Sequence, residues 1–198
     1  MASVYLARHG RTAYNHEGRF QGQRAIPLDD VGRAEAAALA ERASTYGFRA
    51  LWSSPLLRAR ETAEILSRRL GLDPIEDPRL METDAGEWTD RSFAEIQALA
   101  PERFAAFVSA DPGFAFPGGE SFAEQEDRVG AALREIQAGE LPAVVVCHGM
   151  VIRAALMVRA DERIGRFQRV PNAALVPLDP SAEELAQTGG GGEATLAS

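Results

Sequence analysis

Short apolar runs alternate along the chain with longer segments in which apolar residues recur at helical spacing. Val4 to Ala7 and Ala143 to Cys147 have the length and composition of buried strands. Three further stretches are typical of short strands: Arg49 to Trp52, Pro74 to Met81 and Asn172 to Leu178. Strands that alternate with helices predict a mostly parallel sheet covered by helices on both faces. We therefore expect an α/β fold, with a single domain over residues 1–178.

Helix start and stop signals mark the first long segment between these strands. Residues 13–28 are predicted to form a polar loop. Asp29 or Asp30 can then cap a helix that runs to about Tyr46, where Gly47 closes it.

A second helix is predicted to begin after the second strand. Ser54 is a natural N-cap and Pro55 a natural first helical residue, while Gly71 supplies the stop after Leu70. Arg58 would then lie in the first turn of this helix. Three later helical segments are expected: two short helices within 91–108 broken at Pro101, one from Glu120 or Ser121 to Ala138, and one from Gly149 to about Val158.

The region between the acid-containing stretch near residue 82 and the third long helix is rich in phenylalanine. Its members are Phe93, Phe104, Phe107, Phe114, Phe116 and Phe122. A satellite core is the interpretation that we prefer, and an apolar cover over a pocket is the alternative. Residues of about 80–122 would then form a partial cap, and residues 179–198 a flexible C-terminal tail.

Composition narrows the class of protein and its partners. The formal net charge of −8 argues against nonspecific nucleic-acid binding, which needs a basic footprint. Cys147 is the only cysteine, so no intrachain disulfide can form, and a cytoplasmic location is expected. The apolar runs are too short to span a bilayer, and the N-terminus lacks a signal-peptide core. We therefore expect neither nucleic acid nor membrane as a partner, and leave a homodimer open.

Two histidines each follow a predicted strand and precede a glycine. His9-Gly10 comes after the first strand beside Arg8, and His148-Gly149 follows the Val144 strand. Ligands of open α/β sheets bind outside the carboxyl ends of the strands, so both imidazoles are expected to face one crevice. A neighbouring arginine disfavours a protonated imidazole, which should keep His9 neutral and nucleophilic. Arg8 also offers bidentate donors to a phosphate.

The same residue types also have plain structural interpretations. A histidine after a strand is commonly structural, and His16 is interpreted as a surface loop residue. Arg58 at a helix amino end could help to bind an anion, or could simply be solvated. Glu82 is either a loop carboxylate in water or an acid for chemistry.

Taken together, the motifs resemble the histidine phosphatase superfamily, in its phosphoglycerate-mutase-like branch, over about Val4 to Val176. Individually each motif is weak, whereas their order and spacing are specific. The matching motifs are Arg8-His9-Gly10-Arg11-Thr12 with Asn15; Phe20-Gln21-Gly22, Pro27-Leu28 and Gly32; Ser53-Ser54-Pro55-Leu56-Leu57-Arg58-Ala59 with Thr62-Ala63; Leu80-Met81-Glu82 with Gly86 and Trp88; Pro117-Gly118-Gly119-Glu120-Ser121; and Val146-Cys147-His148-Gly149.

The resemblance implies a three-layer α/β/α sandwich and a phosphoric monoester hydrolase that acts on a small phosphorylated metabolite, without a metal or another cofactor. It implies that His9 becomes phosphohistidine and that Glu82 gives a proton to the leaving oxygen. The groups that would hold the phosphoryl group are Arg8, Arg58 and His148. The phosphate or substrate side would also include Asn15, Gln21, Gly22 and Gly149.

Two departures from the family's pattern concern the substrate. Many relatives have Trp-Glu-Gly where this chain has Trp88-Thr89-Asp90. The resemblance therefore does not identify which phosphorylated metabolite is the substrate. Met150 follows His148-Gly149 where small or polar residues are frequent, so a more apolar pocket mouth is expected.

Three alternatives to a phosphatase are considered. A mutase of the same family would return the phosphoryl group to substrate. The resemblance implies that a glycolytic mutase has a longer insertion after the acid motif, with extra substrate-binding basic residues, whereas the only basic residues between Trp88 and Pro117 here are Arg91 and Arg103. This spacing favours hydrolysis. A non-catalytic phosphate-binding module would normally have lost some of the five residues to which the resemblance assigns the chemistry. All five are present here: Arg8, His9, Arg58, Glu82 and His148. A metal hydrolase would use the two histidines and the acid as ligands, although the nearby arginines disfavour a divalent cation.

Overall fold

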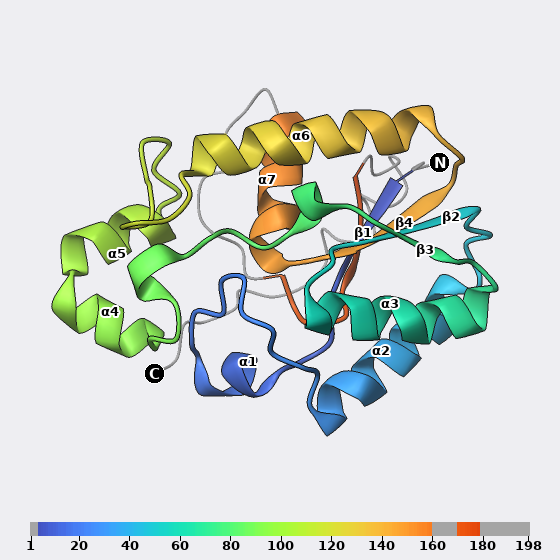
Figure 1. The fold of residues 1–198 in the computed structure, drawn as a ribbon, viewed down its shortest axis with the longest axis horizontal. Coiled ribbons are helices and arrows are strands. Elements are labelled where there is room, and N and C mark those ends of the chain that lie inside the picture. Colours follow the sequence, from blue (N-terminus) through green and yellow to red (C-terminus); the bar gives the residue numbers. More distant parts are fainter. Residues whose placement is uncertain (1–3, 160–169, 179–198) are drawn as a thin grey trace, which may run out of the picture.

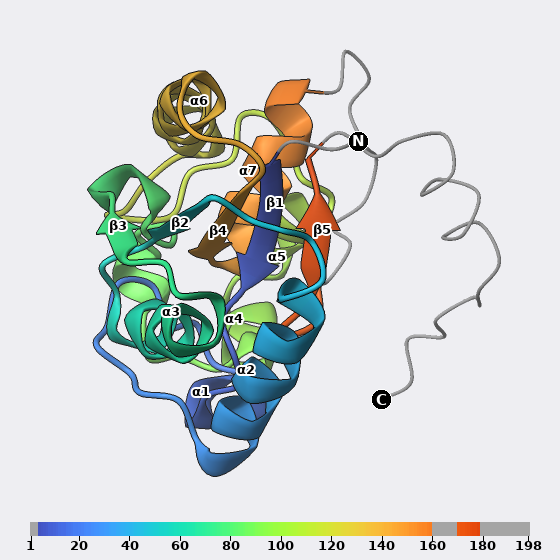
Figure 2. The same cartoon turned by 90° about the vertical axis from the view of Figure 1, so that its right-hand side faces the viewer.

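A five-stranded sheet forms the centre of the computed structural model, which describes residues 4–159 and 170–178. The strands are β1 (Val4–Arg8), β2 (Ala50–Ser53), β3 (Pro74–Glu76), β4 (Ala143–Cys147) and β5 (Leu175–Pro177). They follow the order β3-β2-β4-β1-β5, and of these strands only β5 runs antiparallel to its neighbour. The predicted mostly parallel sheet is therefore confirmed (Figure 2).

Helices cover both faces of this sheet, as the two views show (Figures 1 and 2). One layer holds α2 (Asp30–Ala43) and α3 (Leu57–Leu70), and the other holds α6 (Phe122–Ala138) and α7 (Gly149–Arg159). Side chains of β1 alternate between the two layers: Val4 and Leu6 pack with α6 and α7, while Tyr5 and Ala7 pack with α2 and α3. The expected three-layer α/β/α sandwich is confirmed.

Two short helices, α4 (Phe93–Leu99) and α5 (Pro101–Val108), lie together at one end of the molecule (Figure 1). They confirm the pair of helices predicted on either side of the Pro101 break. Short 3₁₀ turns at Pro78–Leu80 and Gly86–Trp88 precede them. A third buried cluster centres on Trp88 and Phe107 and includes other aromatic residues of this region. The preferred interpretation, a satellite core, is therefore confirmed.

The predicted polar loop at 13–28 is partly wrong, because α1 (Ala13–Glu17) lies within it (Figure 1). The Thr12 hydroxyl accepts the Asn15 N–H, and the Asn15 side chain accepts the Thr12 N–H. This reciprocal cap usually has Glu or Gln at its third position, so the asparagine hid the signal. His16 is exposed as expected, but on this helix.

The predicted start of α3 is also wrong, since the helix begins at Leu57 and its N-cap, Leu56, makes no side-chain bond. The Ser54 hydroxyl accepts the Leu56 N–H at 3.3 Å and contacts His148, but the helix begins three residues after Ser54, so Ser54 is not its N-cap. Gly71 ends the helix in a left-handed conformation, as predicted. Arg58 lies in the first turn, as expected.

Other boundaries move by a few residues. The helix predicted to reach Tyr46 ends at Ala43, because the Ser44 and Thr45 hydroxyls bond back to preceding carbonyls. The strand predicted over 74–81 stops at Glu76, where Asp77 caps a 3₁₀ turn. The predicted last strand, 172–178, shortens to Leu175–Pro177, which follows a turn containing Ala173 at a φ of 53°.

The capping box predicted for Ser121 and Glu124 is present, and Gly139 follows the end of α6. The predicted tail at 179–198 lies outside the described residues, and the division at residue 178 stays a prediction. Within the described residues, no helix has both the length and the apolar character needed to cross a membrane.

Candidate active site

The two strand-end histidines lie side by side at one edge of the sheet. β1 and β4 are adjacent and parallel, and their register pairs Arg8 with Cys147. The His9 N–H donates to the Cys147 carbonyl at 3.0 Å, which continues the pairing one residue beyond β1. The ring centroids of His9 and His148 are 5.2 Å apart. The structure thus brings together two imidazoles that are 139 residues apart in the chain (148 − 9).

The contacts of His9 define which ring nitrogen carries a proton. Nδ1 lies 2.7 Å from the Gly10 carbonyl, so it must donate there. Nε2 then holds the lone pair, and it accepts a hydrogen bond of 3.3 Å from Nε of Arg58. Burial, followed by the charges of Arg58 and Arg8, holds the pKa of His9 well below its usual range. The ring is therefore neutral and its Nε2 nucleophilic at neutral pH.

Arg58 is wholly buried at the start of α3. Its Nη1 donates to the Arg24 carbonyl at 3.0 Å and its Nη2 to the Gly22 carbonyl at 2.9 Å. The loop that contains Gly22 therefore fixes the guanidinium beside His9. Burial lowers the pKa of Arg58 to about 10, so the group still carries its positive charge at neutral pH.

His148 has a different partner, and so a different tautomer. Its Nε2 lies 2.8 Å from the Ser54 hydroxyl, which itself accepts the Leu56 N–H at 3.3 Å. We assign the hydroxyl proton to this bond, because within the described residues His148 Nε2 is the only acceptor that the Ser54 hydroxyl contacts, and the ring proton then lies on Nδ1. Within the described residues this buried Nδ1 has no hydrogen-bond partner. Burial, followed by the charge of Arg58, keeps the pKa of His148 well below its usual range, so Nδ1–H is a neutral donor that needs an acceptor.

Glu82 lies just after the Pro78–Leu80 turn and contacts the start of α7. Its carboxylate accepts the Thr83 N–H at 3.0 Å and the Met150 N–H at 3.5 Å. Burial raises the pKa of Glu82, an effect that the charge of Arg58 only partly opposes. Arg8 lines the same pocket and donates to the Val170 carbonyl. A carboxylic acid with a raised pKa and two arginines thus lie close to the two imidazoles.

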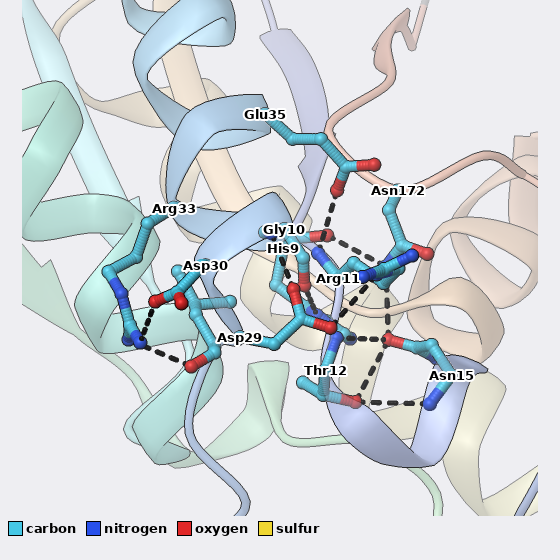
Figure 3. A network of polar contacts seen from close by, with 12 residues as sticks. His9, Gly10, Arg11, Thr12, Asn15, Asp29, Asp30, Arg33, Glu35 and Asn172 are labelled. Atoms are coloured by element: carbon cyan, nitrogen blue, oxygen red, sulfur yellow. Dashed lines mark hydrogen bonds and ion pairs between the residues drawn. The ribbon is translucent and has the colours of Figure 1, made fainter. Parts of the chain in front are cut away.

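Side-chain amides form another part of the site (Figure 3). The Asn15 amide oxygen accepts from the Thr12 N–H at 3.2 Å and from Asn172 at 3.1 Å. The Gln21 amide oxygen contacts the Thr12 hydroxyl at 3.0 Å. Both oxygens are therefore in use, and within the described residues neither NH₂ group has an acceptor. Asn15 and Gln21 line the pocket, so these NH₂ groups can serve an anion there.

Close packing of α2 holds the loop after β1 in place. A Cβ on Gly10 would lie 2.2 Å from the Gly32 carbonyl oxygen, so only glycine fits. Arg11 ties the same loop to α2, because its side chain pairs with Asp29 at 2.9 Å and its N–H donates to Glu35 at 2.8 Å (Figure 3). The glycine after His9 therefore serves to seat a helix against the nucleophile's loop.

One pocket connects this cluster to the aromatic cap. The two histidines and Arg58 are not among its lining residues, but their neighbours Arg8, Glu82 and Gly149 are, and we call this side the inner end. The rest of the lining includes Phe93, Phe107 and Phe116 of the Phe-rich region. The Phe-rich region is thus both a satellite core and a wall of the pocket, and the two interpretations are not exclusive. Gly22, the remaining predicted residue, also lines this pocket.

Several contributors escaped the sequence reasoning. Asn172 donates to the His9 carbonyl at 3.1 Å from the far end of the chain, and no local signal predicts that contact. Asp90 has a φ of 70° and accepts from the Tyr14 hydroxyl at 3.0 Å and from Arg24 at 2.8 Å. The absence of the expected glycine at position 90 was the available signal, since a left-handed residue there needs a reason.

The geometry does not favour a metal centre built on the two histidines and the acid. Among residues 4–159 and 170–178, no three His, Cys, Asp or Glu side chains are grouped so that they could hold a metal ion. The lone pair of His9 Nε2, which a metal would need, instead accepts from the Arg58 cation.

Comparisons with known proteins agree on one family. A model of the histidine phosphatase superfamily (branch 1) matches residues 4–187. The chain is 37% identical over 187 residues to a protein of Yersinia pestis named "Probable phosphoglycerate mutase GpmB", covering 90% of this chain and 85% of that protein.

Solved structures with a similar fold include mycobacterial hydrolases. A structure titled "Mycobacterial hydrolase 1" has a TM-score of 0.82 and 33% identity, covering 88% of this chain and 87% of that chain. A mycobacterial glucosyl-3-phosphoglycerate phosphatase with VO3 has a TM-score of 0.78 and 32% identity, covering 88% and 91% of the two chains.

Proposed function

Because the chain belongs to the histidine phosphatase superfamily, we propose that it hydrolyses a small phosphomonoester through a phosphohistidine formed on His9. One observation carries the proposal: a neutral imidazole, whose unprotonated Nε2 accepts only a long hydrogen bond of 3.3 Å, lies beside a buried arginine and a second imidazole. This cluster has two fixed positive charges, Arg8 and Arg58, and the buried Nδ1 of His148 has no hydrogen-bond partner within the described residues. It is therefore complementary to a tetrahedral dianion.

The first step transfers the phosphoryl group to the protein. His9 Nε2 attacks phosphorus as the bond from phosphorus to the ester oxygen breaks. Charge on the three equatorial oxygens is stabilised by Arg8, Arg58 and the Nδ1–H of His148. Protonated Glu82 donates its proton to the leaving alkoxide, and its raised pKa helps to keep part of the population protonated before the reaction.

The second step frees the enzyme. Glu82, now a carboxylate, accepts a proton from a water molecule, whose oxygen attacks phosphorus as the bond to His9 Nε2 breaks. The products are inorganic phosphate, protonated Glu82 and a neutral His9, so the protein returns to its starting state. Nδ1 keeps its proton throughout, because the Gly10 carbonyl holds it at 2.7 Å.

A mutase is the second candidate, since the Yersinia pestis relative is named a probable phosphoglycerate mutase. In that case a second hydroxyl, rather than water, would attack the phosphohistidine. Such a substrate would need cations for its carboxylate. The aromatic residues that line the outer pocket give a site of a different kind, so hydrolysis is the better supported reaction.

The test compares His9→Ala with His16→Ala, since His16 is an exposed histidine on the neighbouring helix α1. Hydrolysis of p-nitrophenyl phosphate should fall at least about 10³-fold for H9A and stay within about twofold for H16A. Rapid quenching with a labelled substrate should trap an acid-labile phosphoprotein in the unmodified protein and in H16A, but not in H9A. Full activity of H9A, or activity that EDTA abolishes and zinc restores, would refute the proposal.

A further inference from the structure

The pocket beyond Glu82 has a composition that selects among phosphomonoesters. Arg8 and Glu82 line its inner end, where the ester oxygen would lie if the proposed function holds. The pocket extends from there, so the rest of it would receive the leaving alcohol rather than the phosphoryl group. The side chains of the outer pocket therefore contact the part of the substrate that differs between metabolites.

Aromatic rings form much of this outer wall. Phe20, Phe93, Phe107 and Phe116 all line the pocket, together with Met150. The rings of Phe20 and Phe93 meet edge to face with centroids 4.5 Å apart, and those of Phe107 and Phe116 with centroids 5.6 Å apart. Phe93 lies on α4 and Phe107 on α5, while Phe20 and Phe116 lie in two loops, so packing between four separate segments holds these rings in place. They present hydrocarbon surface to a ligand.

The tyrosine and the outer arginine near these rings are already engaged, and the side-chain amides of the pocket are neutral donors on its phosphate side. The Tyr14 hydroxyl donates to Asp90 at 3.0 Å. Arg19 pairs with Glu17 at 2.6 Å and also donates to the Asp90 carbonyl at 2.8 Å. Among the described lining residues, Arg8 and Arg19 are the only cations, and Arg8 lies at the phosphoryl end. A carboxylate on the leaving group would thus lack an uncommitted cation in the described wall.

The size of the pocket fits a compact group. Its volume is about 120 Å³. An enclosed apolar cavity of roughly 150 Å³ in an engineered protein holds a benzene molecule. A single ring or a branched alkyl group of similar size therefore matches the space, whereas a hydroxylated sugar would leave its hydroxyl groups against hydrocarbon.

We infer that the preferred substrates are monoesters of a compact apolar alcohol, best an aromatic one, and not phosphoglycerates or sugar phosphates. The inference rests on the proposed function, because it requires the phosphoryl group to lie at the histidine end. It assigns to Phe93 a role in substrate selection. Phe93 suits a test because it is 38% exposed and does not belong to the buried aromatic cluster.

The experiment measures kcat/KM for benzyl phosphate, ethyl phosphate, glycerol 3-phosphate and 3-phosphoglycerate. The leaving alcohols of the first two are similar in basicity, so their difference reports binding of the ring. Benzyl phosphate should be favoured over each of the others by about tenfold or more, mainly through a lower KM. Phe93→Ser should lower kcat/KM for benzyl phosphate about five- to tenfold and leave that for ethyl phosphate within about twofold.

Leu99→Ser is the matched control, because Leu99 lies on the same helix α4, is 70% exposed and does not line the pocket. It should change neither substrate. Equal rates for benzyl and ethyl phosphate, a preference for 3-phosphoglycerate, or equal losses in F93S for both esters would overturn the inference. Those results could occur while His9-dependent hydrolysis of p-nitrophenyl phosphate persists, so the proposed function would survive them. Hydrolysis of p-nitrophenyl phosphate that does not depend on His9 would instead refute both the proposed function and this inference.

Discussion

The two ends of the pocket are held together in different ways. At the phosphoryl end, each imidazole has a directed hydrogen bond, and Arg58 is fixed by two backbone carbonyls. At the outer end, Phe107 and its aromatic neighbours pack ring against ring. Directed bonds define proton positions, whereas ring packing defines shape. We therefore expect changes at the first end to affect every substrate, and changes at the second to affect some substrates more than others.

Glu82 lies at the junction of the two ends. Its replacement should lower the rate of hydrolysis more than a change at Ser54 or Asp90 would. Glu82→Gln keeps the shape of the side chain but removes the proton that the leaving alkoxide needs. Hydrolysis of benzyl phosphate should fall about 10²–10⁴-fold, and that of p-nitrophenyl phosphate far less, because nitrophenolate leaves without help. The kcat/KM values of the two esters test this, because they report the first step and not the water attack, in which Glu82 acts on the same phosphohistidine for both esters. Equal losses would remove Glu82 from the acid role.

The pH dependence of hydrolysis by the unmodified protein and by E82Q tests the same role of Glu82. Burial raises the pKa of Glu82, so its protonated fraction falls as the pH rises through that raised value. Burial and nearby arginines lower the pKa of His9, so its neutral form persists to a pH well below the usual histidine range. The ratio of unmodified to E82Q rates with benzyl phosphate should therefore decline towards high pH. Substrate ionisation cancels in this ratio, and a flat ratio would contradict the assignment.

An intermediate effect is expected at Ser54, which acts through His148. Ser54→Ala removes the hydroxyl that keeps the His148 ring proton on Nδ1. One hydrogen bond contributes about 1 kcal/mol, so kcat/KM should fall about fivefold, and equally for benzyl and p-nitrophenyl phosphate. Ser54→Thr should restore much of the loss. Ser53→Ala is the control, because Ser53 is also buried but its hydroxyl donates to the Ser54 carbonyl and not to an imidazole. A loss confined to benzyl phosphate would contradict this role.

The smallest effect is expected at Asp90, which joins the loop after α1 to the cap. Its left-handed backbone costs a non-glycine residue about 1–2 kcal/mol. Its partly exposed bonds to Tyr14 and Arg24 return a similar amount. Asp90→Gly should therefore change the free energy of unfolding by less than about 1 kcal/mol, and Asp90→Ala should cost about 1–2 kcal/mol. Urea unfolding measures both, and equal values for the two variants would contradict the argument.

The same contrast between the two ends explains what could be predicted from the sequence. His9 and His148 each follow a strong apolar run, and parallel strands end at one edge of a sheet, so their meeting followed from local patterns. The place of Arg58 at a helix start was predicted, but the pattern favoured a solvated arginine, and only the family resemblance implied its role in the site. The error at Ser54 arose because a serine before a proline has the same local pattern whether it caps a helix or bonds to a distant histidine.

The outer end was less predictable because its contacts are not local. Phe20 meets Phe93 and Phe116 across long stretches of chain, and no periodicity in the sequence indicates that contact. A satellite core and a pocket wall were treated as alternatives, but one set of rings has both roles. Asn172 was missed for a similar reason, because its amide reaches His9 from the other end of the chain.

The register between β1 and β4 sets the distance between nucleophile and second imidazole. Neighbouring strands lie about 4.8 Å apart in any sheet, and the two ring centroids are separated by 5.2 Å. The distance between the two rings is thus close to the spacing of the two strands that position them. Lengthening either strand by one residue would leave both histidines at strand ends yet carry one past the other, so a well-folded protein of this kind could lose its chemistry through a single insertion.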